Sequence, residues 1–209
     1  MKAELLCTFG DDLMVVNAAR VSMAKYHEDF DPESDTRLIN YLARENHFSP
    51  FCHPKAQFRI ELPIFVARQW EKHRIGAVRG YDIYDQSEVS RRYVDDEPEF
   101  FVPTEWRSRP DGSIKQGSGE NLDRIKSAAC HFDLESVHIH AVDTYNALLK
   151  RGVAPEQARM VLPQTMYTQW VETGSLAYWY RLCDLRMDAH AQREINDLAC
   201  QVSAQMETA

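Results

Sequence analysis

The sequence predicts one domain of mixed helix and strand, of the α/β or α+β class. Its 209 residues are long for one ordinary domain and short for two. Residues 55–62 alternate strictly between apolar and polar side chains, which is the period of a half-buried strand. Residues 122–149 instead repeat apolar side chains at helical spacing. Both periods in a chain of this length predict a single domain over residues 1–209.

Before the alternating strand, the sequence predicts one strand and two helices. Residues 3–8 have the pattern of a strand, and residues 13–22 that of a short helix. Asp31 suits a helix N-cap and Pro32 the first helical position, and apolar residues within 38–43 continue that helix.

After the alternating strand, Pro63 suits the first turn of a helix, which the positive run Lys72 to Arg74 closes. A further strand is predicted over residues 87–94. Residues 107–119, rich in Ser, Gly, Arg and Asp, are predicted to be a loop.

The remaining elements are mainly helical, and Gly152 and Pro163 separate them. The predicted elements are a helix over 122–149, a short helix opening at 154–159, a strand over 165–172, and a helical stretch over 176–203 that divides around Asp188.

Charge and the N-terminal sequence exclude several classes of protein. A formal net charge of -8 argues against a general nucleic-acid binder, which needs a basic surface to displace counterions. Residues 1–7 have no long apolar core and are soon followed by Asp11 and Asp12, so they resemble neither a signal peptide nor a membrane span. We therefore expect a cytoplasmic protein.

Cysteine spacing and nucleotide motifs narrow the chemistry further. The five cysteines include no CxxC pair, so we expect reduced thiols, no zinc site and no bound metal. No GxGxxG or GxxxxGKS motif occurs, so any nucleotide must be held by side chains instead of a glycine-rich turn.

Two polar segments, QWEKHR at 69–74 and SEVSRRY at 87–93, are the most informative part of the chain. They gather cations, carboxylates, hydroxyls and an amide where a helix meets a strand, which suits an anionic, planar ligand. This composition predicts a nucleotide site. The candidate cations for a phosphate are Arg74, Arg92, Arg159 and Arg186.

A single arginine near a helix end more often complements the helix dipole or forms a surface ion pair. Arg159 argues against that interpretation, because it lies in the apolar run 158–163 and a partly buried charge needs a partner.

Cys52 beside His53 suggests a thiolate nucleophile. Adjacent residues of an extended segment point to opposite sides, so the two side chains are poorly placed to share a proton. We therefore expect no cysteine nucleophile, and we keep His53 as a ligand contact.

These residues resemble the flavin-dependent thymidylate synthases. That family's signature is Arg-His-Arg, seven residues, then Ser, in a segment that ends Asn-Glu-x-Ser-x-Arg-Tyr. The chain matches it with three departures: Lys72 is the first basic residue, Ser87 replaces Asn, and fifteen residues separate Arg74 from Ser90. Further segments that look like the family, in the expected order, are 18–22, 49–53, 63–70, 158–163 and 185–195.

The resemblance implies an α+β subunit, with a mainly antiparallel curved sheet flanked by helices. It implies a homotetramer with FAD and substrate sites at the subunit contacts. It also implies FAD-dependent reductive C5-methylation of a uridine monophosphate, foremost dUMP to dTMP. Methylenetetrahydrofolate would give the carbon, NADPH would reduce the flavin, and no cysteine nucleophile would be needed.

Carried over by position, the resemblance also implies roles for particular residues. Arg186 and Ser90 would be catalytic, with Arg186 stabilising negative charge on the pyrimidine. Tyr93 and His53 lie where the family's folate is stacked or approached. The expected FAD contacts are Ser22, His53, Lys72, His73, Arg74 and Glu88. The expected substrate contacts are Gln69, Ser90, Arg92, Tyr93, Arg159 and Arg186.

Two departures from the family bear on specificity and on flavin binding. Eight extra residues lie within Ile75 to Gln86, either as a solvent loop or as a change in substrate choice. Ser175, Ala177 and Arg181 stand where Asn, Arg, and Asn or His are commoner, which puts FAD contacts at these positions in question.

Three hypotheses follow. The first is a thymidylate synthase acting on dUMP. The second is a UMP 5-methylase of a nucleoside-antibiotic pathway, because a reshaped loop could admit the 2'-hydroxyl and such a site discriminates weakly. The third is a nucleotide- or flavin-binding protein that has lost turnover. The joint presence of seven polar side chains disfavours the third: His73, Arg74, Glu88, Ser90, Arg92, Arg159 and Arg186.

Overall fold

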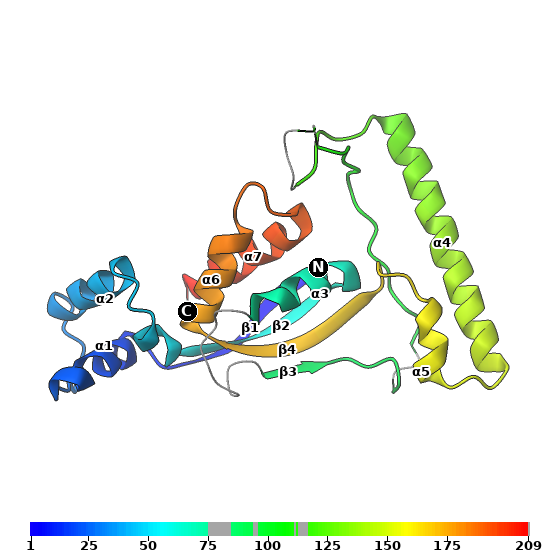
Figure 1. The fold of residues 1–209 in the computed structure, drawn as a ribbon. Helices are drawn as coiled ribbons and strands as arrows, with labels where there is room; N and C mark the ends of the chain where they lie inside the picture. The colour runs from blue at the N-terminus through cyan, green and yellow to red at the C-terminus, as the bar shows by residue number, and fades with distance from the viewer. Residues whose placement is uncertain (75–84, 94–95, 111, 113–116, 209) are drawn as a thin grey trace.

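The computed structural model describes residues 1–74, 85–93, 96–110, 112 and 117–208 (Figure 1). Within these residues, four strands form one antiparallel sheet in the order β1-β2-β4-β3. They are β1 (Lys2–Phe9), β2 (Lys55–Pro63), β3 (Asp85–Glu88) and β4 (Tyr167–Ser175). Figure 1 shows that β4 is long and curved. The predicted α+β class, with a curved antiparallel sheet and flanking helices, is confirmed.

Helices occupy three regions of the molecule. The α-helices are α1 (Asp12–Arg20), α2 (Ser34–Arg44), α3 (Ile64–Trp70), α4 (Arg124–Lys150), α5 (Pro155–Ala158), α6 (Leu176–Arg186) and α7 (Arg193–Met206). The short 3-10 helices are η1 (Val21–Met23), η2 (Ser49–Cys52), η3 (Glu71–Arg74) and η4 (Arg159–Val161). In Figure 1, α3, α6 and α7 lie over one face of the sheet, whereas α1–α2 and α4–α5 lie at its two opposite ends. None of the helices in the described part of the chain is both long and apolar enough to span a membrane.

The alternating strand is the structural centre, as its sequence predicts. β2 pairs with β4 without interruption from Lys55 opposite Ser175 to Pro63 opposite Tyr167. Its apolar side chains are fully buried, because they face α3, α6 and α7. The largest fully buried side chains of this core include Trp70, Trp170 and Trp179. β4 continues to Ser175, three residues beyond the predicted end at 172.

The start of α2 differs from the prediction. Pro32 and Glu33 form a turn directly after Asp31, and the helix begins at Ser34. The Asp31 carboxylate still accepts hydrogen bonds from the backbone N–H groups of Glu33 and Ser34, at 2.9 and 3.1 Å. Asp31 therefore satisfies free N–H groups as a cap does, but the turn that it stabilises precedes the helix.

The strand predicted over 87–94 is wrong for residues 89–93, because β3 ends at Glu88; residue 94 lies outside the described part of the chain. Residues 91–93 form a turn, in which the Tyr93 N–H donates to the Ser90 carbonyl at 3.0 Å. The Ser90 hydroxyl accepts from the backbone N–H of Arg92, at 3.3 Å. Side chains such as Ser offer the backbone an alternative to a sheet ladder, and this alternative prevails here.

The second half follows the sequence prediction closely. Asp123 caps α4 by accepting from the Lys126 N–H, and Gly152 follows the helix with φ +84°, in the left-handed region that favours glycine. The helical stretch divides around Asp188 into α6 and α7, as predicted. Within the predicted loop 107–119, a backbone bridge joins Arg107 to Asn121.

Candidate functional site

A histidine and an arginine meet where α3 and α6 end. His73 lies in η3, directly after α3, and its side chain is buried with 6% exposed. Nε of Arg186, the last residue of α6, donates a hydrogen bond to Nε2 of His73. Burial, together with the charges of Arg186 and Arg181, lowers the pKa of His73 to about 4. His73 is therefore neutral at pH 7 and can accept this bond.

The same end of α3 presents two further polar side chains. Lys72 is exposed beside His73. Gln69 is half-buried, and its Oε1 is enclosed without a hydrogen-bond partner among the described residues. A buried acceptor without a donor is uncommon, and this oxygen could meet an N–H of a ligand only if the side chains that enclose it move. Arg74 ends η3, and the predicted contact of its side chain lies outside the described part of the chain.

The polar residues predicted on the β3 side lie along β3 and the turn after it. Glu88 ends β3, opposite Trp170 of β4, and its Oε1 accepts from the Thr168 hydroxyl at 2.6 Å. Arg92 Nε donates to the Ser90 hydroxyl at 3.2 Å. The Arg92 guanidinium lies 5.1 Å from the centre of the Tyr93 ring. Glu88, Arg92 and Tyr93 are exposed, so they can contact a ligand.

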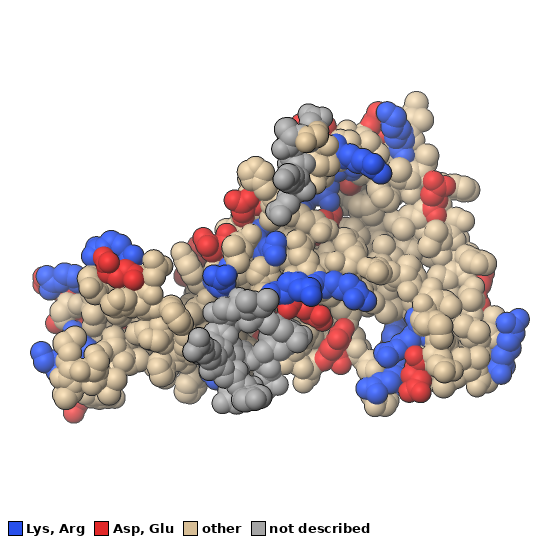
Figure 2. Space-filling model, in the orientation of Figure 1, with Lys and Arg blue, Asp and Glu red and all other residues tan. Residues whose placement is uncertain are grey.

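Positive side chains gather near the middle of the face drawn in Figure 2, between the two ends of the molecule, with acidic side chains beside them. Among the described residues, Lys72, Arg92, Arg181 and Arg186 have no carboxylate within ion-pair distance. Cations without an acidic partner are suited to phosphate groups. Arg181 adds a charge here that the sequence did not assign to the site.

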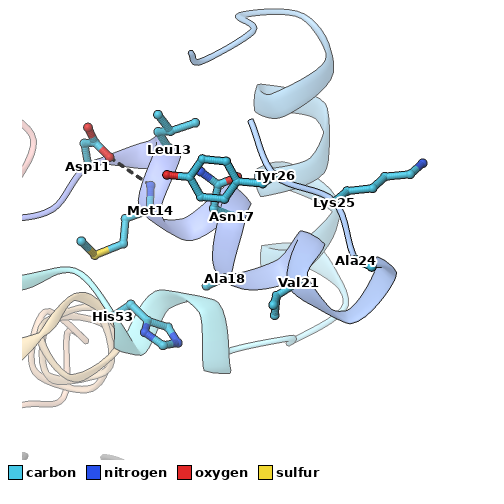
Figure 3. Close-up of a pocket in the computed structure, with 10 residues that line it drawn as sticks. All are labelled: Asp11, Leu13, Met14, Asn17, Ala18, Val21, Ala24, Lys25, Tyr26 and His53. Atoms are coloured by element: carbon cyan, nitrogen blue, oxygen red, sulfur yellow. Dashed lines mark hydrogen bonds between the residues drawn. The ribbon is translucent and has the colours of Figure 1, made fainter. Parts of the chain in front are cut away.

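His53 lies apart from this cluster, at the N-terminal end of the molecule. It follows η2 and lines a cavity of 680 Å³ with residues of α1 and of the chain after it (Figure 3). In Figure 3, Met14 and Ala18 of α1 lie nearest to His53, whereas the Lys25 side chain points away from it. Ser22 lies in η1, next in the sequence to Val21, which lines this cavity. The exposed Ser22 hydroxyl donates to the Ala19 carbonyl at 2.9 Å.

The sequence argument against a Cys52 nucleophile assumed an extended segment, and that assumption is wrong. The structure still disfavours Cys52 as a nucleophile, for a different reason. Residues 49–52 form the 3-10 helix η2, and His53 has helical backbone angles, so the segment is not extended. Burial raises the pKa of the Cys52 thiol. The thiol also donates to the Phe48 carbonyl, at 3.6 Å. A raised pKa disfavours the thiolate that a nucleophile requires.

Arg159 also lies apart. It begins η4, after α5, and its Nε donates to the Glu156 carbonyl at 3.3 Å. Its side chain is exposed, so the prediction of a partly buried charge is wrong. In the apolar run around it, Ala158 is fully buried, whereas Met160 is 73% exposed. Within the described residues, Arg159 contacts neither His73 nor Arg186.

Two of the residues that depart from the family pattern, Ser175 and Arg181, have definite contacts in the structure. Ser175 caps α6, and its hydroxyl accepts from the Tyr178 N–H at 3.2 Å while the side chain is buried. It therefore serves the fold and is not presented to a ligand. Arg181 is exposed and close enough to His73 to lower its pKa. The insert predicted within Ile75 to Gln86 lies largely outside the described residues.

Glu172 was not singled out from the sequence, although it lies beside the site. It is fully buried on β4 and accepts hydrogen bonds from Trp70 and Trp170, at 2.9 and 2.8 Å, and from Tyr178. The available signal was its position: in a strand, residues 170 and 172 share one face, and Trp170 marks that face as buried.

Comparisons with known proteins agree on one family. The model of the family described as thymidylate synthase complementing protein matches residues 4–209. The chain is 36% identical over 199 residues to the flavin-dependent thymidylate synthase of Thermosipho africanus, covering 95% of this chain and 82% of that protein. It is 38% identical to the Kosmotoga olearia enzyme of the same name, with the same two coverages.

A solved structure resembles the whole fold. The UMP/dUMP methylase PolB from Streptomyces cacaoi, bound with 5-Br dUMP, matches with a TM-score of 0.82 and 31% identity. The match covers 99% of this chain and 90% of that one. The same enzyme bound with 5-Br UMP matches with a TM-score of 0.77 and 29% identity, covering 99% of this chain and 86% of that one.

Proposed function

Because the chain belongs to the thymidylate synthase complementing protein family, we propose that it methylates C5 of a uridine monophosphate reductively, converting dUMP to dTMP. It is a methyltransferase of the flavin-dependent thymidylate synthase type. The observation that carries the proposal is the His73–Arg186 pair, which brings two predicted ligand contacts together at one site. The other site roles are proposals of the same kind.

The donors around η3 and α6 fit FAD. The side chains proposed to hold it are Ser22, His53, Lys72, His73, Arg74 and Glu88, with Arg181 as an added cation. A flavin dinucleotide carries a diphosphate, for which cations without carboxylate partners are suited. When bound, FAD would supply hydride taken from NADPH, so that the one-carbon unit of methylenetetrahydrofolate becomes a methyl group.

The nucleotide would be held by side chains that also favour the reaction. We assign Gln69, Ser90, Arg92, Tyr93, Arg159 and Arg186 to it, with Arg186 and Ser90 as the catalytic residues. Neutral His73 accepts one N–H of Arg186 and so fixes the guanidinium. The remaining N–H groups of Arg186 could then meet the pyrimidine carbonyls, where negative charge develops. Oε1 of Gln69, which is enclosed in the structure, would accept from the base once neighbouring side chains move.

Assembly as a homotetramer is part of the proposal. The predicted contacts lie in three regions: Ser22 and His53 at one end, His73 and Arg186 centrally, and Arg159 beside α5 near the other end (Figure 1). A second copy could bring the end regions of one chain to the central region of another. α4 also exposes apolar side chains that a partner could cover. A folate site and a cytoplasmic location stay predictions.

UMP is the second candidate substrate, and the likeness to a UMP/dUMP methylase favours it. A site that merely tolerates the 2'-hydroxyl discriminates weakly between UMP and dUMP. A nucleotide- or flavin-binding protein without turnover is the third candidate, and the presence of His73 and Arg186 in direct contact disfavours it.

The test is methylation of an equal mixture of dUMP and UMP by the FAD-loaded protein, with NADPH and methylenetetrahydrofolate, read by mass spectrometry. We expect methylated dUMP. Methylated UMP alone would replace the first candidate by the second, and no product from either would favour the third. Arg186→Ala is the paired variant: it should retain flavin absorbance and lose at least about 100-fold in kcat, the scale of one lost transition-state donor.

A further inference from the structure

The carboxylate of Glu172 joins three elements inside the core. Oε2 accepts from Trp70 Nε1 at 2.9 Å and from Trp170 Nε1 at 2.8 Å. Oε1 accepts from the Tyr178 hydroxyl. Glu172 itself is 0% exposed. Burying a carboxylate is costly unless hydrogen bonds compensate it, so these donors and the acid depend on each other.

A neighbouring glycine leaves room for the Tyr178 ring beside Glu172. Gly174 lies two residues beyond Glu172, on the same face of β4. A Cβ added at Gly174 would lie 2.3 Å from Cδ1 of Tyr178. Glycine therefore lets the tyrosine ring lie against the strand and reach the carboxylate. The rings of Trp70 and Trp170 meet edge to face, with their centres 6.4 Å apart.

Two of the three donors belong to the elements that carry the site. Trp70 ends α3, directly before η3 with Lys72 and His73. Tyr178 lies about two turns before Arg186 in α6. The two elements meet again where Arg186 donates to His73. β3 lies alongside as well, with Gln86 opposite Glu172 and Glu88 opposite Trp170.

We propose that Glu172 is a positioning residue for the flavin and nucleotide site. Its carboxylate fixes the end of α3 through Trp70 and the start of α6 through Tyr178, both against β4. The spacing between His73 and Arg186 is thereby set from within the core. This inference rests on the proposed function for the identity of the two ligands, FAD and dUMP.

Variants that remove one hydrogen-bond donor test the contact of Glu172 with α3 and its contact with α6 separately. Tyr178→Phe releases α6, which carries Arg186, so the Kd of the FAD-loaded protein for dUMP should rise roughly tenfold. The Kd for FAD should rise less, because Arg181 is the one proposed FAD contact that lies on α6. Trp70→Phe releases the end of α3, so the Kd for FAD should rise roughly tenfold. Glu172→Leu should weaken both. The single-donor variants decide the matter if Glu172→Leu does not fold.

Trp179→Phe is the matched control. Trp179 is equally buried in the same core, but its Nε1 donates to the backbone carbonyls of Ala56 and Gly174, both at 3.1 Å. Trp179→Phe removes these hydrogen bonds, so it should lower Tm while leaving the Kd values for FAD and for dUMP unchanged. If Trp179→Phe shifts both Kd values as much as the other two variants do, the effect is general loosening and the role of Glu172 is disproved.

The same measurements separate this inference from the proposed function. A wild-type protein that binds neither FAD nor dUMP overturns the proposed function and removes the ligands assumed for Glu172. A wild-type protein that binds both, while Tyr178→Phe and Trp70→Phe keep its Kd values, overturns the role of Glu172 alone.

Discussion

Among single residues, His73 shows most clearly how burial sets chemistry. Its ring is nearly enclosed, and two arginines face it from α6. Each of these effects disfavours the protonated ring, so His73 stays neutral where an exposed histidine would begin to charge. Neutrality is what allows Nε2 to accept from Arg186. A protonated His73 would instead repel the arginine that we assign to the pyrimidine.

This neutrality predicts a pH dependence of stability. An unfolded histidine takes up a proton near pH 6.5, whereas folded His73 does so only near pH 4. Between these values the unfolded chain binds more protons, so the free energy of unfolding falls as pH is lowered through this window. His73→Gln keeps an acceptor for Arg186 and removes the titration. Its urea midpoint should therefore fall less between pH 6.5 and 4 than that of the wild type.

Comparing His73→Gln with the wild type removes the contribution of other groups that titrate in the same pH range. Burial also lowers the pKa of His138, but that residue is present in both proteins. Parallel curves of urea midpoint against pH for the two proteins would show that His73 protonates equally in the folded and unfolded states.

Single residues also mark what the sequence could and could not predict. The QWEKHR segment predicted correctly that His73 lies where a helix ends, because the Pro63 start and the basic end are local signals. Its contact with Arg186 joins residues 113 positions apart, so only the resemblance to a family suggested a shared site. Glu172 was not predicted from the sequence, because its hydrogen-bond donors come from α3, β4 and α6 and no local sequence pattern relates these elements.

At the scale of elements, α1 and α2 are held together by one buried acid. Asp35 of α2 is 0% exposed and accepts from Arg20 at 2.7 Å, from His27 at 2.9 Å and from the Asp31 N–H at 3.0 Å. Burial alone would raise the pKa of Asp35, but these hydrogen bonds hold it well below its usual range. The α1–α2 pair thus contains a buried ion pair beside the buried apolar residues Val15, Val16 and Leu42.

Asp35→Ala should therefore destabilise the protein strongly. It leaves the Arg20 guanidinium, whose side chain is 15% exposed, without its acidic partner. Removing one member of a buried pair typically costs about 3 kcal/mol or more, measured here as the change in the free energy of unfolding in urea. The matched control is Glu33→Ala, an exposed acid just before α2, expected to change it by less than about 0.5 kcal/mol. Equal changes in the two variants would contradict the assigned role of Asp35.

Element boundaries show why sequence patterns succeed unevenly. β2 was predicted almost to the residue because its alternation matches burial against one layer of helices. The strand predicted to continue to 94 failed after Glu88, where the Ser90 side chain stabilises a turn. A period of two indicates which face is buried, but it does not reveal when a side chain competes with the ladder.

At the scale of the whole molecule, α4 has two unlike faces. His138, Ala141 and Tyr145 are buried against the rest of the chain. On the opposite face Ile125, Phe132 and Ile139 recur every seven residues and are 84%, 73% and 58% exposed. A helix normally keeps its apolar stripe covered, so this second stripe is where we propose that copies of the chain meet. The single-domain organisation over 1–209 stays a prediction.

Phe132→Asp should break this interface. Burying a phenylalanine contributes about 2 kcal/mol, so placing a carboxylate there should weaken association by at least roughly 30-fold in Kd. We expect a smaller species by light scattering after gel filtration, while Phe132→Leu, which keeps the face apolar, retains the wild-type mass. Methylation should fall together with assembly if Arg159 and His73 serve one site from different copies. An unchanged mass for Phe132→Asp would exclude α4 from the interface, and a smaller species with full activity would show that one chain completes the site.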